Sequence, residues 1–239
     1  RETSAEATYV QQSYRLDEKE AQIPQQSLKK LNVLEKRFEV LTTRLESQGS
    51  AFSSLWEELQ SISEELEEIA EEQEGFTNRM KNLRIDENNV RTKLNELSRK
   101  LQHADRLLHR GNIPGIPDEM EARLEEADEQ IYIVKQSLQE VPLNMQLVDS
   151  YLGNAAKVVQ DVTEKVEELL ENVMLIEWII QYGNRYRASN PEMHARLLEA
   201  EESFRQFRYA KALEEAATAV EEVEPGAMKR IEELVKEQV

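Results

Sequence analysis

The stretch that decides the fold runs from residue 31 to residue 108 and begins LNVLEKRFEVLTTRL (residues 31–45). Two apolar rows, one starting at Leu31 and the other at Leu34, repeat through it every seven residues and stay in phase. Three polar residues interrupt these rows: Gln48, Gln73 and Glu87. An alternation of three and four residues between apolar positions is the seam of a left-handed coiled coil. We therefore expect one long heptad helix over residues 27–110 that packs against partner helices.

The composition favours long helices and excludes several kinds of site. Charged residues make up 33% of the 239 residues and aromatic residues only 6%, which is typical of helical rods. The net charge of −18 argues against nucleic acid as a partner and against docking on an anionic membrane surface. The sequence has no cysteine, which excludes disulfides and thiolate metal sites.

The sequence contains no segment that we expect to cross a membrane. None of its apolar runs approaches the roughly 18 residues that a spanning helix needs. Because the sequence begins with Arg1 and not with methionine, we expect it to be a fragment of a longer protein. Any contact with a membrane would then be made through an anchor upstream of this chain.

A second heptad seam follows the first. The segment GNIPGIP (residues 111–117) ends the first helix, because glycine at the boundary and prolines after it are stop signals. Apolar residues then recur at spacings of four and three from Met120 to Ile180. This pattern predicts a second helix over residues 118–187, antiparallel to the first because the connection is short, with Leu108 beside Met120. Pro142 lies inside this seam and either kinks the helix or begins a new one.

The charges of the two seams are complementary. Residues 76–110 carry nine basic and four acidic side chains, whereas residues 118–140 carry eight acidic and two basic ones. Opposite flanking charges select partner helices in coiled coils. We therefore interpret the basic residues of 76–110 as partners of the acidic residues of 118–140 within the same chain. The alternative is a binder of nucleic acid or another anionic surface through residues 79–110, and salt-sensitive binding would favour it.

The ends of the chain complete an all-α fold in this interpretation. Residues 1–26 are expected to be the end of an upstream helical repeat, broken at Pro24. The apolar face widens beyond residue 142, which indicates a helix contacted from two sides. We expect residues 190–239 to supply that contact, beginning with an Asn190 N-cap and running back over about residues 141–187. The predicted architecture is an elongated antiparallel coiled-coil bundle in which residues 86–142 form a two-helix tip.

The sequence offers little for catalysis. Its three histidines are His103, His109 and His194, and the first two are spaced so that they do not share a helix face. The chain has no phosphate-binding glycine loop, no HExxH and no GxSxG. We therefore expect no enzyme activity, no cofactor and no metal site.

One polar segment, QYGNRYR (residues 181–187), stands out for another reason. Gln181, Asn184 and Arg185 lie at spacings that put them on one helix face, with aromatic residues beside them. Arginine, tyrosine and tryptophan are enriched in interface hot spots, so the segment predicts a partner-binding face. The other interpretation is structural: Arg185 and Arg187 complement the helix dipole, and the aromatic rings complete the core.

Three segments give the chain a family resemblance: SYRL (residues 13–16), QYGNRYR (residues 181–187) and the tail from Phe204 to Ala227. They resemble the EzrA family, the septation ring formation regulators of low-GC Gram-positive bacteria. The resemblance implies a membrane helix followed by a cytoplasmic rod of spectrin-like repeats, of which this chain would be the C-terminal part. It implies binding to FtsZ and other division proteins, at the cytoplasmic side of the membrane at the division site.

The resemblance also implies the residues of a patch that places the protein at mid-cell: Gln181, Tyr182, Gly183, Asn184, Arg185, Tyr186 and Arg187. The residues alone leave a second class of function open, a generic spectrin-like spacer or adaptor that binds another helical protein. They also leave the oligomeric state open, because a heptad seam is satisfied equally well within one chain or between chains.

Overall fold

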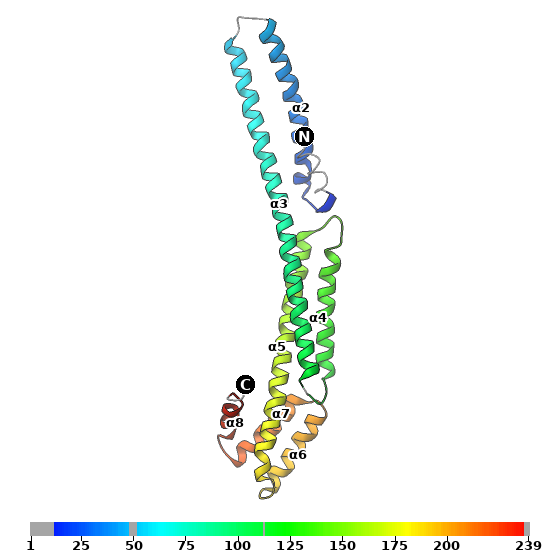
Figure 1. Ribbon diagram of the computed structural model, residues 1–239, viewed down its shortest axis with the longest axis vertical. Coiled ribbons are helices and arrows are strands. Elements are labelled where there is room, and N and C mark those ends of the chain that lie inside the picture. The colour runs from blue at the N-terminus through cyan, green and yellow to red at the C-terminus, as the bar shows by residue number, and fades with distance from the viewer. Residues whose placement is uncertain (1–11, 48–51, 112, 237–239) are drawn as a thin grey trace. The chain divides into compact units, whose positions relative to one another are not determined.

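A computed structural model describes residues 12–47, 52–111 and 113–236 of the chain. Every regular element in these ranges is a helix, which confirms the all-α class (Figure 1). The α-helices are α2 (Glu18–Ser47), α3 (Phe52–Arg110), α4 (Asp118–Ser137), α5 (Met145–Gly183), α6 (Pro191–Arg205), α7 (Tyr209–Val223) and α8 (Ala227–Lys236). The chain divides into two compact units, residues 1–93 with 135–150 and residues 94–134 with 151–239.

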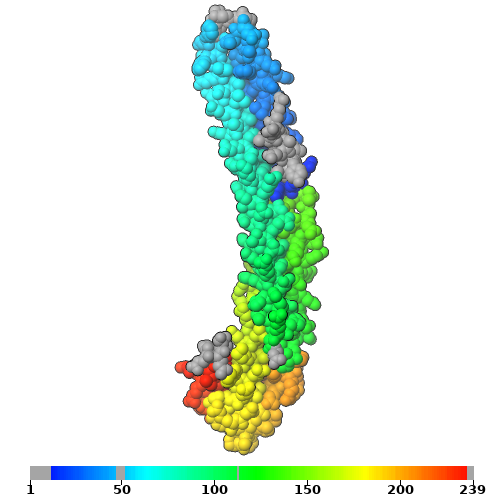
Figure 2. All heavy atoms as spheres, in the orientation of Figure 1, coloured from blue at the N-terminus to red at the C-terminus, as the bar shows by residue number. Residues whose placement is uncertain are grey.

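In the first unit, α2 and the first part of α3 form an antiparallel hairpin (Figure 1), and their atoms lie against one another along it (Figure 2). The pairs Lys30–Glu72 at 3.0 Å and Arg37–Glu65 at 2.6 Å join the two helices. Their core consists of Leu34, Leu41, Ile62 and Ile69. The single helix expected over residues 27–110 is therefore two helices, and residues 48–51 between them lie outside the described part. The heptad pattern did not reveal the reversal, because the same rows serve a continuous helix and a hairpin equally well.

The start of the chain also differs from the expectation. Pro24 does not break a helix but lies buried inside α2. An ion pair between Glu20 and Arg79, at 3.4 Å, holds the beginning of α2 on α3. Tertiary packing thus offsets the one backbone hydrogen bond that proline removes. The first part of the helix expected before Pro24 falls on residues 1–11, outside the described residues.

In the second unit, the end of α3, α4 and most of α5 lie side by side as three helices (Figure 1). Arg123 of α4 binds Asp161 of α5 at 2.9 Å, and Leu108 and Met120 are buried at the α3–α4 end. The helix expected over residues 118–187 is thus two helices, and the chain reverses around the anticipated break at Pro142. The two-helix tip expected over residues 86–142 is replaced, over residues 94–134, by a bundle in which α5 is the third helix.

The expected charge match between the seams produces no ion pair inside this bundle. Among the described residues, no base of 94–110 pairs with an acid of 118–134. In the first unit, Arg91 reaches the neighbouring α4 segment through a backbone contact instead, donating to the carbonyl of Leu138 at 3.4 Å. That contact agrees with the predicted antiparallel register of the two seams.

The last three helices pack around the end of α5. Asn190 caps α6 as predicted, and its side-chain oxygen accepts from the Met193 N–H at 3.1 Å. The 15 residues of α6 span only about 22 Å, so α6 covers the end of α5 and not the length from 141 to 187. At Phe207 the backbone turns with a φ of 60° into α7, whose Tyr209 hydroxyl donates to the Gly115 carbonyl at 2.6 Å.

Candidate docking site at the end of α5

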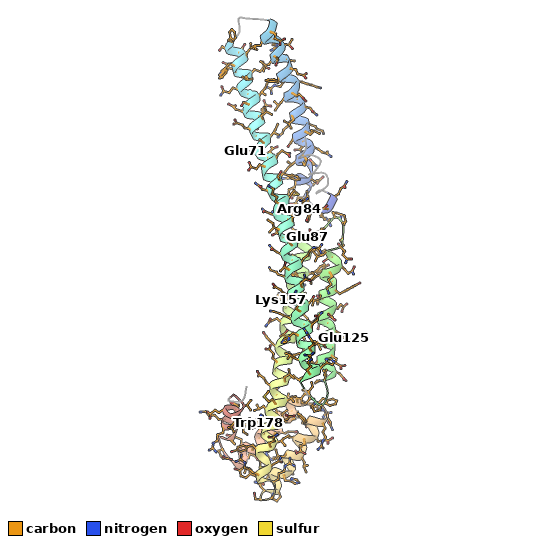
Figure 3. The ribbon with its side chains drawn as sticks, viewed as in Figure 1. Glu71, Arg84, Glu87, Glu125, Lys157 and Trp178 are labelled. Carbon is orange, nitrogen blue, oxygen red and sulfur yellow. The ribbon has the colours of Figure 1, made fainter. Side chains whose placement is uncertain are left out.

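Gly183 ends α5 and fixes the position of the polar segment, residues 181–187, against the neighbouring helices. Its Cα lies so close to α6 and α7 that an added Cβ would stand 2.8 Å from Leu197 Cδ1 and 2.9 Å from Met193 Cε. A short 3₁₀ turn, Asn184–Tyr186, follows. The close approach of Gly183 therefore seats the segment directly on the cluster formed by Ile179, Met193, Leu197 and Val220. Figure 3 marks Trp178 on this part of α5, where it packs against the same cluster.

Three of the seven predicted residues face solvent together. Gln181, Asn184 and Arg185 are exposed. The Arg185 guanidinium lies 3.5 Å from the centre of the Tyr182 ring and 5.7 Å from that of Tyr186. Its Nε donates to the Tyr182 carbonyl at 3.0 Å. Stacking and this bond hold the side chain in one place, while its two terminal nitrogens have no partner among the described residues.

Both tyrosines are anchored by one carboxylate at the C-terminal end of α7. Glu224 Oε2 accepts from the Tyr182 hydroxyl at 2.7 Å and from the Tyr186 hydroxyl at 2.6 Å. The hydrogen bond from Tyr186, and after it the bond from Tyr182, lowers the pKa of the Glu224 carboxyl. The bond between Tyr186 and Glu224 also raises the pKa of the Tyr186 hydroxyl. Arg230 of α8 pairs with the other carboxylate oxygen. The platform beneath Arg185 is therefore built from α5, α7 and α8 together.

Two predicted residues do not belong to the exposed face. Gly183 is buried, and Arg187 turns inward, where it is half-buried and pairs with Glu201 of α6. The seven residues thus divide into three that are exposed, two tyrosines that support them, and two that serve packing. The structural interpretation agrees with the structure for the aromatic rings, because Trp178, Tyr182 and Tyr186 pack against the core cluster. Gln181, Asn184 and Arg185 remain exposed.

Glu224 and Arg230 were missed by the sequence reasoning. Glu224 lies 42 residues after Tyr182, and no periodic pattern connects the two positions. The only hint was the Pro225-Gly226 break beside it, which ends α7 and brings the chain back toward α5. Only the packing of α7 against α5 places the carboxylate at the two hydroxyls.

The site has the chemistry of recognition. Two amides supply donors and acceptors, and a guanidinium with a free fork of N–H groups suits a carboxylate. In the described ranges no group of three or more histidine, aspartate or glutamate side chains is arranged to hold a metal ion. The same residues include no helix with the length and apolarity required to traverse a bilayer.

Comparison with known proteins identifies the family. The family model described as "Septation ring formation regulator, EzrA" matches residues 1–235. The chain belongs to the EzrA family. A Geobacillus member is 40% identical over 238 residues, which cover 100% of this chain and 42% of that protein. A Bacillus pumilus member is 44% identical over 126 residues, covering 53% of this chain and 22% of its own length.

The family assignment agrees with a solved structure. The cytoplasmic domain of the bacterial cell division protein EzrA superposes with a TM-score of 0.53 at 36% identity, covering 87% of this chain and 40% of that one. The chain thus spans about two fifths of the length of the Geobacillus member and of the solved cytoplasmic domain. Family membership supports a role in cell division and septation.

Proposed function

We propose that this chain is part of a non-enzymatic regulator and scaffold of the bacterial division ring. In this proposal it binds FtsZ and other division proteins and restrains ring assembly on the cytoplasmic side of the membrane at the division site. The observation that supports it is the exposed trio Gln181, Asn184 and Arg185, with Arg185 stacked on Tyr182, in a chain of the septation-regulator family.

The trio acts as a prepared docking face. Stacking on Tyr182 and the bond to its carbonyl fix the Arg185 side chain before a partner arrives. A prepared side chain loses less conformational entropy on binding, which favours affinity. The free guanidinium fork makes a charge-assisted contact with an acidic group of the partner, and the two amides add hydrogen bonds.

Co-sedimentation with FtsZ assembled in GTP tests the proposal. The wild-type chain is expected to pellet with the polymers, and Gln181→Ala with Asn184→Ala and Arg185→Ala is expected to stay in the supernatant. A matched control replaces three exposed polar residues elsewhere on α5, Asn154→Ala with Lys157→Ala and Gln160→Ala, and should pellet like wild type.

Two outcomes contradict the proposal. Equal pelleting of both triple variants would show that FtsZ is bound through another surface. If the wild-type chain itself remains in solution, this part of the protein does not bind FtsZ. In dividing cells the patch variant, but not the control, is expected to lose mid-cell placement while circular dichroism shows intact helices.

A further inference from the structure

The α2–α3 hairpin buries only one of its two heptad rows. Leu34, Leu41, Ile62 and Ile69 of the buried row are 3–6% exposed. The other row remains open to solvent: Phe38 at 52%, Leu45 at 55%, Phe52 at 69%, Leu59 at 40% and Leu66 at 42%. Trp56, beside this row, is 67% exposed. A stripe of six large apolar side chains is far more than a two-helix surface leaves open by chance.

The open row has the shape of a groove for a helix. One hollow of about 330 Å³ lies among side chains of both helices, including Phe38, Leu45, Phe52 and Trp56. A second, of about 370 Å³, continues it past Leu59 toward Leu66. On α3 the stripe recurs at spacings of four, three and seven residues, which keep its side chains on one helix face against which another helix can pack. A third helix laid in this groove would complete a three-helix bundle.

The rim of the groove is acidic. The residue that follows each member of the open row lies about 100° further round its helix, on the flank of the stripe. Three of these positions hold a glutamate, Glu39 and Glu46 on α2 and Glu67 on α3. Glu74 extends the rim, because it follows Gln73, the polar residue at the next position of the same row. All four are exposed, and within the described ranges none has a cationic partner.

Three basic residues of α2 are paired elsewhere and do not neutralise this rim. Lys30, Arg37 and Arg44 pair with Glu72, Glu65 and Glu58, on the side of the hairpin away from the open row. Beyond the rim, α3 carries further acids, among them Glu71 (Figure 3). The groove therefore combines an apolar floor with a negatively charged rim.

We propose that this groove docks an amphipathic helix with an apolar seam and with lysine or arginine on its flanks. Flanking charges select the partner in coiled coils, and only a basic partner finds opposite charges here. A second copy of this face would bring four glutamates against four glutamates, which disfavours self-association through it. The proposal is independent of the docking face at residues 181–187.

Trp56 supplies the reporter for the test. The full chain carries Trp178→Phe, in the other unit, so that Trp56 alone emits. The probe is a synthetic helix of about three heptads with leucine at a and d and lysine at e and g, matched by a twin with glutamate at e and g. The lysine helix is expected to shift Trp56 emission to shorter wavelength and to saturate, and the glutamate twin is not.

Variants separate the floor from the rim. Phe38→Gln with Leu59→Gln should abolish the shift while leaving circular dichroism unchanged, because both side chains are already exposed. Glu67→Gln with Glu74→Gln should weaken binding about fourfold at low salt, since each exposed charge pair contributes about twofold. Glu68→Gln, an exposed neighbour on the opposite side of α3, is the matched control and should bind like wild type.

Three results would overturn the proposal. Equal binding of the two helices would show that the rim does not select charge. Binding of the lysine helix unaffected by the Phe38 and Leu59 substitutions would place it elsewhere. Concentration-dependent dimerisation in sedimentation equilibrium that the same substitutions abolish would make a second copy the occupant.

Discussion

Two glycines of α5 should respond to alanine in opposite directions, and the comparison tests how the docking platform is built. Gly183 has φ −69° and ψ −24°, values that any residue adopts, so glycine is not needed there for its backbone freedom. It is needed for space, because α6 and α7 press on its Cα. Gly153 lies in the interior of the same helix, exposed, and an added Cβ there meets nothing within 4 Å.

The magnitudes follow from these surroundings. At Gly183 the new methyl would contact Leu197 at 2.8 Å, Met193 at 2.9 Å and Val220 at 3.4 Å, all of them fully buried. Overpacking costs about 1–3 kcal/mol, and the gain in helix propensity offsets less than about 1 kcal/mol at a helix end. Gly183→Ala should therefore lower the free energy of unfolding by about 1 kcal/mol, and Gly153→Ala should raise it by about 0.5–1 kcal/mol.

Urea denaturation followed by circular dichroism, and by Trp178 fluorescence in a Trp56→Phe background, measures both variants. The slope of the unfolding free energy against urea should be unchanged, so that the midpoints report stability alone. In thermal melts each kcal/mol should move Tm by about 2–4 °C. A Gly183→Ala variant as stable as wild type would refute the crowding argument. An unstabilised Gly153→Ala would refute the claim that its surroundings are open.

Two further predictions concern a helix cap and a buried tyrosine. Asn190→Ala removes the acceptor for the Met193 N–H and should lower the unfolding free energy by about 1 kcal/mol in urea titrations, whereas Asn190→Gly should cost only a few tenths. Burial, and then the hydrogen bond to Glu87 at 2.5 Å, raise the pKa of Tyr14 to about 12. Because this pKa is raised above the ordinary value of about 10, the stabilisation is complete below pH ~10 and is lost as pH rises toward 12. Ultraviolet absorbance should show one tyrosine ionising near pH 12 that Tyr14→Phe removes, and an unchanged titration curve would contradict the assignment.

Local physics explains why the helices could be predicted from the sequence. The heptad rows fix the α-helical period and the apolar faces, and most apolar positions of the second seam are buried, as Met120, Val134 and Val159 illustrate. Asn190 and Pro191 start α6 where their capping chemistry predicts. The exposed trio Gln181, Asn184 and Arg185 follows in the same way from helical spacing close to the end of α5.

The positions at which the chain turns back between helices could not be predicted from the heptad pattern. A heptad seam specifies that a helix needs partners but not whether the partner is the next segment or a distant one. One row pattern over residues 27–110 therefore served two helices, and the seam over residues 118–187 served two more.

The sequence by itself thus determined the class of fold, the period of its seams and the polar face near the end of α5. Only the tertiary structure decided where the chain turns and what supports that face. Glu224 reaches Tyr182 and Tyr186 because α7 packs on α5, and Gly183 is crowded because α6 does the same. Contacts between residues of different helices depend on the packing of whole helices, and no local preference encodes them.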